Sequence, residues 1–578
     1  MQESWQLGRL RKMNKKRLSA LLAACNTMKR ADNSSLDPEV SSLVYDSRDV
    51  GPGSMFFAIP GAHTDGHRFI ATALEKGAAA VVFQTKDEFV SRLIQDGIPD
   101  DFPRDIQLPH PVFIAAESSR QALSRCSAAF HDYPHRDLTV IGITGTDGKS
   151  STVAFLHQLL NDLGIPAGFI STVAMQTGTE TRNNMLRQST PEAPDIHRLL
   201  AEMRANGKQA AVVESTSHGL SRKTSRLLDL EYDGAIFTNI SHEHLEFHGS
   251  FPQYLSDKTN LFRQLKDSQP DASNTSVAVI NLEDPNFSYI ARAAAERSAR
   301  ICAFISSQSG DWPRTEARKD LDLADILFAA HPVEHLSDGN RFSLRVVEKS
   351  AWSGQPAGKS LKQLIDQTEA LEMHLPIPGG FNIDNVLGCT ALLSELLSVP
   401  VREIAGAAAG LKGVKGRMVP LFHGQPFTAI VDYAHTPGSF TKVFPLFRES
   451  CRGRLIAVFG SAGERDTAKR PIQGAIAAEY ADILVITDED PRLEDSMDII
   501  RDISRGARES GHAVEIHEIA DRRSAISAAF SMAGEGDTVV MLGKGHEGSI
   551  ITAAGKQAWD EESVARDCLE QMGYTRQK

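Results

Sequence analysis

Cysteines, long apolar runs and excess positive charge are all scarce in this sequence, and each scarcity excludes a class of protein. Its 578 residues contain six cysteines, and no two of them form a CxxC pair or a zinc-ligand spacing. A disulfide framework is therefore excluded, and a reducing cytoplasm is the predicted location. No run of about 18 apolar residues occurs, so no membrane span is predicted. The 62 Lys and Arg are outnumbered by 74 Asp and Glu, and the net charge of −12 argues against nucleic-acid binding.

The N-terminus has two interpretations. Six basic residues between Arg9 and Arg17 precede the apolar stretch 18–24 and Cys25, as in a signal peptide with a lipid-modified cysteine. The apolar stretch has only seven residues, a length at the lower limit for the hydrophobic region of such a signal. We therefore favour a short amphipathic helix that begins the first domain.

The chain is long enough for about three or four domains of roughly 150 residues each. Its strands and helices alternate, which predicts α/β domains with mostly parallel sheets. We expect a small α/β domain at 1–135, a central domain with a mostly parallel sheet at 136–415, and a Rossmann-like domain at 416–578. The expected strands are 55–59, 79–83 and 112–115, then 138–143, 210–214, 234–238, 276–280 and 300–306, and finally 427–431, 455–459, 483–487, 514–519 and 538–542.

Other segments add detail to this prediction. A helix is expected at 71–76, with Gly77 at its end. The polar segment 307–370 is expected to hold antiparallel strands and an insertion. The third domain lacks GxGxxG after its first strand, so no dinucleotide site is predicted there.

The strongest chemical signal is GITGTDGKS at 142–150, which lies between an expected strand and an expected helix. Glycines let backbone N–H groups wrap phosphates, and the helix N-terminus adds a favourable dipole. Because Ile143 replaces the first glycine of the strict pattern, this is a variant P-loop. The alternative is a glycine-rich turn with a surface lysine, which the strand–loop–helix context disfavours. The predicted ATP-binding residues of this loop are Gly145, Thr146, Asp147, Gly148, Lys149, Ser150 and Ser151, with Lys149 on the β/γ-phosphates and Ser150 on Mg²⁺.

Two further motifs follow expected strands of the central domain. Glu214 begins ESTSHG, where a carboxylate at a strand end is well placed to hold magnesium, although a solvated loop glutamate is the alternative. SHEHLEFHG at 241–249 contains His242, His244 and His248. Imidazoles suit a transition metal, whereas a polar capping loop needs no metal, and the spacing does not decide between them.

Motifs in the last third of the chain offer nucleotide and ligand contacts. Asn382 and Asn385 lie on one side of a helical turn, where they bind a nucleotide or cap a helix. Asp432 ends a strand, where it holds a ribose hydroxyl or forms a turn. Three polar loops, at 460–466, 487–492 and 542–547, follow strands of the third domain and should meet at one sheet edge.

The motifs GTDGKS, ESTSHGL, SHEHLEFHG, GGFNIDN, GRM, DYAHTP and GKGHE, in this order, resemble the Mur ligase family, and within it the MurE type. The resemblance runs from about residue 18 to the C-terminus. It implies a UDP-sugar-binding domain, a central ATPase domain and an amino-acid-binding domain. The implied reaction joins meso-diaminopimelate, L-lysine or L-ornithine to UDP-N-acetylmuramoyl-L-alanyl-D-glutamate. ATP drives it through an acyl-phosphate, in peptidoglycan precursor synthesis.

The resemblance also implies a role for each site residue. Lys149, Glu214, His244 and Lys258 are the implied catalytic residues; Ser150, Glu214, His244 and Lys258, as a carbamate, would hold Mg²⁺, which displaces the transition-metal interpretation. The adenine nucleotide would also contact Asn382, Asn385, Arg417 and Asp432. The residues implied for the UDP-sugar dipeptide are Tyr45, Ser47, Ala62, His63, Thr64, Gln188, Ser189, Thr190, Thr216 and Arg226. Those implied for the amino acid are Arg465, Glu489, Asp490, Pro491, Arg492, Gly543 and Glu547.

One departure from the family pattern bears on the amino acid. In family members that use diaminopimelate, the motif at the positions that match 489–492 is similar to D-N-P-R, whereas this chain has E-D-P-R. Asp490 could neutralise Arg492 or attract a distal ammonium, which favours L-lysine or L-ornithine. Arg492 and Arg465 could still bind a distal carboxylate, so the choice stays open.

Two competing functions remain. Another Mur-type ligase, similar to folylpolyglutamate synthetase or to MurC, MurD or MurF, is disfavoured by the D-S-R segment at 46–48 and by the D-P-R and GKGHE pair. An inactive scaffold is disfavoured because the implied ATPase residues are all present. A monomer is expected. The basic N-terminal extension and the insertion near 85–110 have no assigned role.

Overall fold

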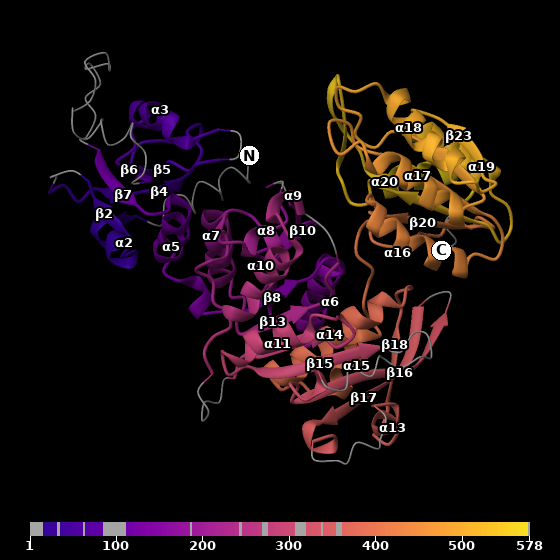
Figure 1. The fold of residues 1–578 in the computed structure, drawn as a ribbon, viewed down its shortest axis with the longest axis horizontal. Coiled ribbons are helices and arrows are strands. Elements are labelled where there is room, and N and C mark those ends of the chain that lie inside the picture. The colour runs from indigo at the N-terminus through magenta and orange to yellow at the C-terminus, as the bar shows by residue number, and fades with distance from the viewer. Residues whose placement is uncertain are drawn as a thin grey trace. The chain divides into compact units, whose positions relative to one another are not determined.

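The structure is a computed structural model (Figure 1). It describes residues 15–31, 35–61, 64–84, 111–184, 186, 188–241, 245–268, 275–306, 320–336, 339–353 and 361–575. Two compact units divide the chain: the first is Met1–Val333, Phe342–Met373 and Asp384–Ala408, and the second is Glu334–Arg341, His374–Ile383 and Ala409–Lys578. Among the helices that the structure describes, none is both long and apolar enough to span a membrane.

The N-terminal part of the first unit is built on a five-stranded sheet with the order β2-β7-β6-β5-β4. Strands β4 to β7 run parallel, and β2 is antiparallel to β7. The strands are β2 (Met28–Arg30), β4 (Ser42–Val44), β5 (Ser54–Phe57), β6 (Ala80–Gln84) and β7 (Val112–Ala116), with a separate pair β1 (Lys16–Arg17) and β3 (Glu39–Val40). The helices are α2 (Leu18–Ala24), η1 (Gly66–Phe69), α3 (Ile70–Glu75), α5 (Ser119–Phe130) and η2 (Pro134–Arg136).

Two local predictions for this region are confirmed. The stretch 18–24 forms helix α2, whose Leu18 and Leu21 are buried in the core of the first sheet. Helix α3 ends at Glu75, and Gly77 adopts a φ of +89°, the left-handed conformation that glycine favours after a helix.

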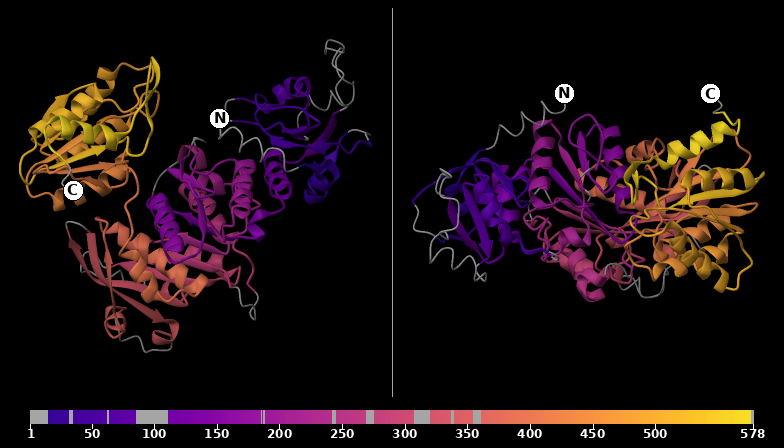
Figure 2. Two further views of the ribbon diagram at one scale, coloured as in Figure 1. Left: turned by 180° about the vertical axis from the view of Figure 1, so that it is seen from behind. Right: turned by 90° about the horizontal axis from the view of Figure 1, so that it is seen from above.

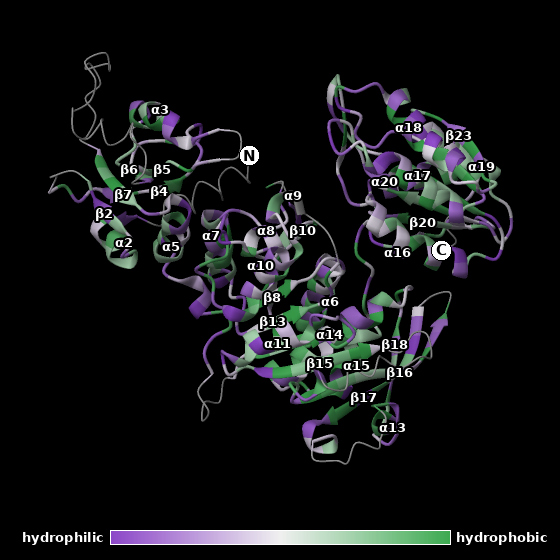
Figure 3. Ribbon diagram, in the orientation of Figure 1, coloured by the Kyte–Doolittle hydropathy of each residue, from purple (hydrophilic) through white to green (hydrophobic). Residues whose placement is uncertain are grey.

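The central sheet of the first unit has eleven strands, with β8 between β12 and β13. Its strand order is β11-β10-β9-β12-β8-β13-β14-β15-β16-β17-β18. From β9 to β16 the paired strands are parallel. They are largely apolar, as the green colour of β8, β13 and β15 in Figure 3 shows, except for the polar second half of β16. The strands are β8 (Thr139–Thr144), β9 (Ala167–Ile170), β10 (Ala174–Gln176), β11 (Arg182–Asn183), β12 (Ala210–Glu214), β13 (Gly234–Phe237), β14 (Val277–Asn281), β15 (Arg300–Ser306), β16 (Ile326–Leu336), β17 (Gly339–Glu348) and β18 (Leu371–Leu375).

Helices connect these strands and cover the sheet. They are α6 (Lys149–Asp162), α7 (Ala193–Ala205), α8 (Ser217–Leu220), α9 (Leu245–His248), α10 (Phe251–Arg263), α11 (Phe287–Ala295), η3 (Lys349–Ala351), α13 (Leu361–Asp366), α14 (Phe381–Leu397) and α15 (Val401–Ala408). Because β8 lies between β12 and β13, the loops that follow all three strands meet at one edge of the sheet.

The second unit contains a six-stranded sheet with the order β19-β20-β24-β21-β22-β23. Only β19 is antiparallel to its neighbour. The strands are β19 (Val419–Leu421), β20 (Thr428–Asp432), β21 (Leu455–Phe459), β22 (Ile483–Ile486), β23 (Glu515–Glu518) and β24 (Thr538–Leu542), with a hairpin of β25 (Ser549–Thr552) and β26 (Gly555–Ala558). The helices are α16 (Pro437–Ser450), α17 (Lys469–Tyr480), α18 (Ser496–Glu509), α19 (Arg522–Met532) and α20 (Glu561–Gln571).

Both faces of this second sheet are covered, as expected for a Rossmann-like domain. Side chains on one face of the sheet, such as Ala457 and Val540, pack with Phe440 of α16 and Ile499 of α18. Side chains on the opposite face pack with α19 and α20. Figure 2 shows helices on both sides of the sheet.

The predicted strands agree with the observed ones to within two residues at every end. The polar segment 307–370 contributes β16 and β17, which are neighbours in the central sheet. Residues 307–319 and 354–360 of this segment lie outside the described residues, as does the whole of 85–110.

A buried ion pair connects the helices of the second unit to its strand ends. The Arg522 and Glu561 side chains are 1% and 0% exposed, with Nη2 and Oε1 2.6 Å apart. Arg522 also donates to the carbonyl oxygens of Asp488, at 2.9 Å, and of Leu542, at 2.7 Å. Trp559 Nε1 donates to Glu561 Oε2 at 2.6 Å. One guanidinium therefore holds the loop after β22 and the end of β24.

Breaking this pair is expected to destabilise the strand ends. Removing one partner of a buried ion pair costs about 3–5 kcal/mol, since the other charge is left buried. We expect Arg522→Ala to lower the opening free energy of β22 and β24 amides by this amount, measured by hydrogen exchange of the full chain. Arg523→Ala is the matched control, because Arg523 and Asp567 are 3.4 Å apart with side chains 40% and 54% exposed. Its effect should stay within about 1 kcal/mol, and equal losses would contradict the assignment.

Candidate active site

The candidate nucleotide loop lies between β8 and α6 and depends on two glycines. Gly145 has a φ of +153° and Gly148 a φ of +83°. A Cβ at Gly145 would lie 1.9 Å from Thr238 Oγ1, and one at Gly148 would lie 2.6 Å from Asn385 Oδ1. Both the backbone conformation and the space therefore require glycine.

Residues that follow β13 hold this loop in place. Thr146 N donates to Asn239 O at 2.7 Å, and Asp147 N donates to Asn239 Oδ1 at 3.0 Å. Thr238 Oγ1 donates to Asp147 O at 2.6 Å. The loop is thus fixed by the neighbouring parallel strand.

Two lysines converge on one carbonyl oxygen of the loop. Lys149 Nζ donates to Gly145 O at 3.1 Å and to Thr146 O at 2.7 Å. Lys258 Nζ, from α10, also donates to Gly145 O, and Lys258 is 2% exposed. Tyr254 supports this arrangement, because its ring centroid lies 4.7 Å from Lys258 Nζ and its hydroxyl is 3.0 Å from Thr146 Oγ1. Two ammonium groups at one oxygen repel each other, most strongly where water is excluded.

A buried carboxylate lies beside the start of α6. Ser150 Oγ donates to Glu214 Oε2 at 3.0 Å, and Glu214 is 1% exposed. Thr172 donates to the same carboxylate through its backbone N, at 2.8 Å, and through Oγ1, at 2.7 Å. A hydroxyl and a carboxylate are the oxygen donors that magnesium prefers, so the residues present fit this ion.

The histidine motif does not form a transition-metal cluster within the described residues. No group of three or more His, Cys, Asp or Glu with metal-binding geometry occurs there. His242 and His244 lie outside the described residues, so the structure does not bear on the role of His244. His248 is buried and pairs with Asp257 and Ser217.

The residues predicted for the dipeptide gather on the loops before α7 and after β12. Thr190 Oγ1 donates to Glu214 O at 2.8 Å and lies 2.9 Å from Thr216 Oγ1. Arg226 pairs with Glu192 at 3.0 Å and donates to Thr190 O at 3.1 Å. The predicted substrate carboxylate would thus meet an arginine that already has an internal carboxylate partner.

The N-terminal residues reach the same region in part. The pKa of Tyr45, which follows β4, is raised to about 12 by burial and by the nearby carboxylates of Asp195 and Glu192. Tyr45 therefore lies near the Glu192–Arg226 pair. Ser47 O accepts from Lys76 Nζ at 2.8 Å, and Thr64 O accepts from Gly61 N at 3.0 Å.

The other predicted dipeptide residues are less informative. Gln188 O accepts from Asn184 Nδ2 at 3.0 Å, and Ser189 follows it in the loop before α7. Ala62 and His63 lie outside the described residues.

The residues predicted for the adenine nucleotide are divided between the units. In the first unit, Asn385 Oδ1 accepts from Thr152 Oγ1 of α6 at 3.1 Å. In the second unit, Asn382 Nδ2 donates to Pro378 O at 2.7 Å.

Arg417 and Asp432 lie together in the second unit. The carboxylate of Asp432 accepts from the backbone N of Met418, at 2.9 Å, and of Ala434, at 2.8 Å. Burial raises the pKa of Asp432, and the Arg417 charge opposes this shift. The guanidinium of Arg417 lies 4.7 Å from the Tyr433 ring centroid.

The loops after β22 and β24 bring three carboxylates around one buried lysine. Lys544 Nζ, with a side chain 0% exposed, donates to Asp490 Oδ1 at 2.9 Å and to Glu547 Oε2 at 2.5 Å. Asp490 Oδ1 also accepts from Ile551 N at 2.9 Å. The partner of Asp490 is therefore Lys544, and not Arg492 as the sequence analysis considered.

Glu489 is the carboxylate of this group with a free oxygen. Its Oε2 is buried and has no hydrogen-bond partner among the described residues. A Cβ at Gly543, whose φ is +101°, would lie 3.1 Å from this oxygen, so a larger residue there would crowd the carboxylate. Burial raises the pKa of Glu489 to about 7, against the opposing charges of Lys469 and Lys544.

The arginines of the amino-acid motifs have different environments. Arg492 follows Pro491 with a φ of +58°, and within the described chain its buried Nε has no partner. Arg465 is exposed in the loop after β21. Arg492 is in the same loop as Glu489, and the loop that carries Arg465 lies beside it, because Gly463 N donates to Asp490 O at 2.8 Å.

Sequence reasoning missed several residues that complete the site. Lys544 was visible in the GKGHE motif, and Tyr254 precedes Lys258 by one helical turn, so both had a signal. Thr172 and Arg522 had no such signal in the sequence, because each lies in a segment without a motif and reaches the site only through the tertiary structure.

Comparisons with known proteins agree with this arrangement. Family models match residues 39–131 (Mur ligase family, catalytic domain), 143–393 (Mur ligase middle domain) and 416–545 (Mur ligase, glutamate ligase domain). A relative from Borreliella afzelii, named UDP-N-acetylmuramyl-tripeptide synthetase, is 38% identical over 96% of this chain and 99% of its own. One of the same name from Roseiflexus is 39% identical over 93% and 96%. A relative from Halalkalibacterium halodurans, named UDP-N-acetylmuramoyl-L-alanyl-D-glutamate--2,6-diaminopimelate ligase, is 31% identical over 88% and 90%.

Solved structures share the fold. A structure titled as a UDP-N-acetylmuramoyl-L-alanyl-D-glutamate--2,6-diaminopimelate ligase has a TM-score of 0.57 at 25% identity, over 92% of this chain and 95% of that one. MurF from Acinetobacter baumannii reaches a TM-score of 0.57 at 18% identity, over 96% and 100%, and is similar in fold alone.

Family models for three Mur ligase domains, and relatives named as synthetases and ligases over nearly the whole chain, place this protein among the ATP-dependent amide ligases. The chain belongs to the Mur ligase family. The fold class and the resemblance that the motifs predicted are confirmed, while the domain boundaries at 135 and 415 stay predictions.

The glycine requirement of the nucleotide loop gives a direct test. Gly148→Ala should weaken ATP affinity by about tenfold or more, because its Cβ would collide with Asn385. Gly164→Ala is the matched control: its φ of +78° is nearly the same, and nothing lies within 4 Å of the added Cβ. Both should lose about 1 kcal/mol of stability from backbone strain. Calorimetric titration with ATP measures the difference, and unchanged affinity in Gly148→Ala would exclude the loop as the phosphate site.

Proposed function

We propose that this chain joins a diamino acid to the D-glutamate of UDP-N-acetylmuramoyl-L-alanyl-D-glutamate, driven by ATP. The observation that carries the proposal is the group of residues around Gly145 O, where Lys149, Lys258 and the Ser150–Glu214 pair surround the nucleotide loop. The names of the relatives from Borreliella afzelii and Halalkalibacterium halodurans support this substrate.

The proposed reaction has two steps. The glutamate carboxylate attacks the γ-phosphorus of ATP, which forms an acyl-phosphate and releases ADP. The neutral amine of the incoming amino acid then attacks the acyl carbon, and a tetrahedral intermediate loses phosphate and a proton to give the amide. Both steps bring anions together, so they need cations and oriented N–H donors more than a covalent nucleophile.

Each part of the first unit has a task in this mechanism. Lys149 leaves the carbonyl oxygens of Gly145 and Thr146 to reach the phosphates. Ser150 and Glu214, with His244 and a carbamate on Lys258, would hold magnesium, which neutralises phosphate charge when bound. Thr190 and Thr216 orient the dipeptide, and Arg226 exchanges Glu192 for a substrate carboxylate.

The environment of Lys258 favours its conversion to a carbamate. The neutral amine attacks carbon dioxide, an N–C bond forms, and one proton leaves. The product is an anion, so the repulsion between Lys258 and Lys149 at Gly145 O becomes an attraction. A carbamate also supplies oxygen donors where an ammonium would repel a metal ion.

The second unit supplies the amino-acid site in this proposal. The free carboxylate oxygen of Glu489 binds the distal ammonium that meso-diaminopimelate, L-lysine and L-ornithine share. Arg492 binds a distal carboxylate if the substrate has one. Asp490 holds Lys544 and the β25 hairpin instead of selecting the substrate. The monomeric state and the cytoplasmic location stay predictions.

A phosphate-release assay tests the proposed function. The enzyme receives ATP, Mg²⁺ and UDP-N-acetylmuramoyl-L-Ala-D-Glu with meso-diaminopimelate, L-lysine, L-ornithine or no amino acid. We expect one diamino acid to stimulate release strongly, and Lys149→Met to lower turnover by about a hundredfold or more, because a cation at the transferred phosphoryl group is lost. Absence of stimulation by all three would refute the proposed acceptor.

The role of Glu489 has a pH signature. Its folded-state pKa of about 7 exceeds the ordinary glutamate pKa of 4.5, so the folded protein binds the extra proton and gains stability as pH falls from about 8 to 5. Glu489→Gln does not titrate. It should therefore be more stable than wild type at pH 8, lose that advantage near pH 5, and raise the KM for the diamino acid.

Glu518, whose pKa is lowered and not raised, is the control. Arg508, whose Nη2 donates to Glu518 Oε1 at 2.8 Å, helps to hold the pKa of Glu518 below its ordinary value, so Glu518→Gln should lose stability at pH 8 and keep the wild-type KM. Melting temperatures across pH and steady-state kinetics measure both effects. A Glu489→Gln variant less stable than wild type at pH 8 would contradict the burial argument.

A further inference from the structure

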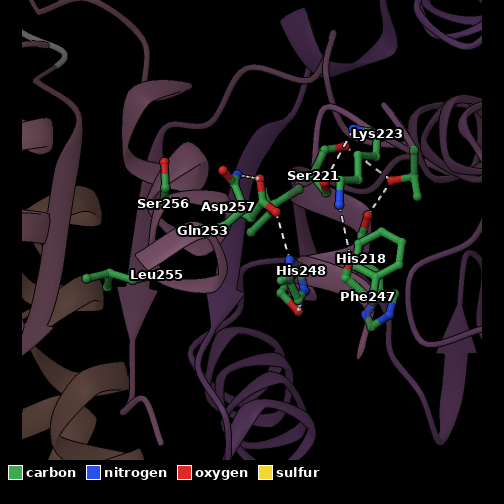
Figure 4. A network of polar contacts seen from close by, with 12 residues as sticks. His218, Ser221, Lys223, Phe247, His248, Gln253, Leu255, Ser256 and Asp257 are labelled. Atoms are coloured by element: carbon green, nitrogen blue, oxygen red, sulfur yellow. Dashed lines mark hydrogen bonds and ion pairs between the residues drawn. The ribbon is translucent and has the colours of Figure 1, made fainter. Parts of the chain in front are cut away.

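His248 contacts two segments of the first unit through its two ring nitrogens, and Figure 4 shows its contact with Asp257. Nδ1 lies 2.7 Å from Asp257 Oδ2, and Nε2 lies 3.1 Å from Ser217 Oγ. The side chain of His248 is 0% exposed and that of Asp257 is 4% exposed. Gln253 Nε2 donates to the other oxygen of Asp257 at 3.1 Å, one turn earlier on α10. His248 is the last histidine of the SHEHLEFHG motif, and the proposed function gives it no task.

The order Ser–His–Asp is that of a hydrolase triad, but burial excludes this role. Ser217 is 2% exposed. A cavity of about 330 Å³ nearby is lined by Ser221, Gln253 and Asp257, and neither Ser217 nor His248 is among its lining residues. A substrate in this cavity would reach the carboxylate and not the hydroxyl, so the three residues act on the protein itself.

Each end of the hydrogen-bond chain is adjacent to a residue of the proposed site. Asp257 immediately precedes Lys258 on α10, and Lys258 donates to Gly145 O. Ser217 immediately follows Thr216, which contacts Thr190 and caps α8. The hydrogen bonds of His248 therefore link the helix that carries Lys258 to the loop that follows Glu214.

The hydrogen-bond directions follow from the acceptor. Because both oxygens of the Asp257 carboxylate accept, Nδ1 of His248 carries a proton and donates to Oδ2, while Nε2 lies within hydrogen-bond distance of the Ser217 hydroxyl. The rings of Phe247 and Tyr254 lie 4.7 Å and 5.0 Å from the His248 ring, centroid to centroid, so it has little freedom to rotate. Orienting partners of this kind fix a neighbouring group without touching substrate.

We propose that His248 is a positioning residue that, through Asp257, sets Lys258 against the nucleotide loop and the dipeptide loop. This proposal rests on the proposed function, in which Lys258 is carbamylated. Loss of the Nδ1 bond would let α10 shift relative to the loop after β12. A displacement of about 1 Å at a reacting centre is enough to cost about a hundredfold in rate.

Two amide variants separate the two bonds of His248. The amide nitrogen of Asn lies near the position of Nδ1, so His248→Asn keeps a donor to Asp257. The amide nitrogen of Gln lies near the position of Nε2, so His248→Gln keeps a contact to Ser217 only. Ser217→Ala, which removes only the Nε2 contact, is the matched control. Each full-length variant is measured for kcat, for the KM values of ATP and the UDP-sugar dipeptide, and for melting temperature.

Asp257→Asn gives a second route if the His248 variants do not fold. Both neighbours of Asp257 donate, so the new amide must present N–H to one of them and breaks one bond at constant volume. A ¹³C spectrum of each protein equilibrated with ¹³C-bicarbonate adds a readout that does not depend on turnover, namely the carbamate signal of Lys258.

The proposal predicts a clear order. His248→Gln and Asp257→Asn should lose kcat by about a hundredfold with KM values within about threefold, and should lose the carbamate signal at an unchanged melting temperature. His248→Asn and Ser217→Ala should stay within about tenfold of wild-type kcat. Wild-type kcat and carbamate signal in His248→Gln would overturn the positioning role, as would equal losses in all four variants with lowered melting temperatures.

Failure of the proposed function would look different. If wild type turns over without a carbamate signal, the carbamate is wrong and the kinetic order still decides the role of His248. If wild type uses none of the three diamino acids, the acceptor is wrong and the carbamate signals of the variants decide it.

Discussion

The carbonyl oxygen of Gly145 is the point on which the first unit depends, because two ammonium groups share it, that of the buried Lys258 and that of the half-buried Lys149. This contact is possible only where the loop has no Cβ, since Gly145 and Gly148 pass against Thr238 and Asn385. The loop is in turn fixed by Asn239 after β13, and Glu214 at the end of β12 accepts a hydrogen bond from Ser150 at its other side. Parallel strands bring these residues to one edge, so the charge cluster is a consequence of strand order.

The second unit uses the same principle with a different anchor. Its ligand loops also follow parallel strands, but a buried guanidinium holds them: Arg522 binds the carbonyl oxygens at the ends of β22 and β24 while Glu561 neutralises its charge. The loops above it can then keep carboxylates close together. Lys544 compensates Asp490 and Glu547, which leaves one oxygen of Glu489 as the uncompensated acceptor.

Both units show that a charged residue in a motif is not by itself a ligand-binding residue. Arg226 and Asp490 are in motifs that resemble substrate contacts, and each has a strong internal partner, Glu192 or Lys544. A substrate that uses Arg226 must replace Glu192, whereas a substrate that meets Glu489 finds an oxygen that no described residue hydrogen-bonds. Burying an unpaired polar group is costly, and a ligand that pairs it recovers this cost.

The sequence alone determined the strands, the nucleotide loop and the family, because these depend on local patterns: apolar runs, glycines at left-handed positions and motifs in a fixed order. It also predicted that the polar loops of the second unit share a sheet edge. It did not predict the partners. Ser150 and Glu214 are 64 residues apart, Asp490 and Lys544 are 54 apart, and His248 meets Ser217 from 31 residues away. Only the tertiary structure decides such pairs, because packing sets which buried charges face each other, and no local pattern records that distance.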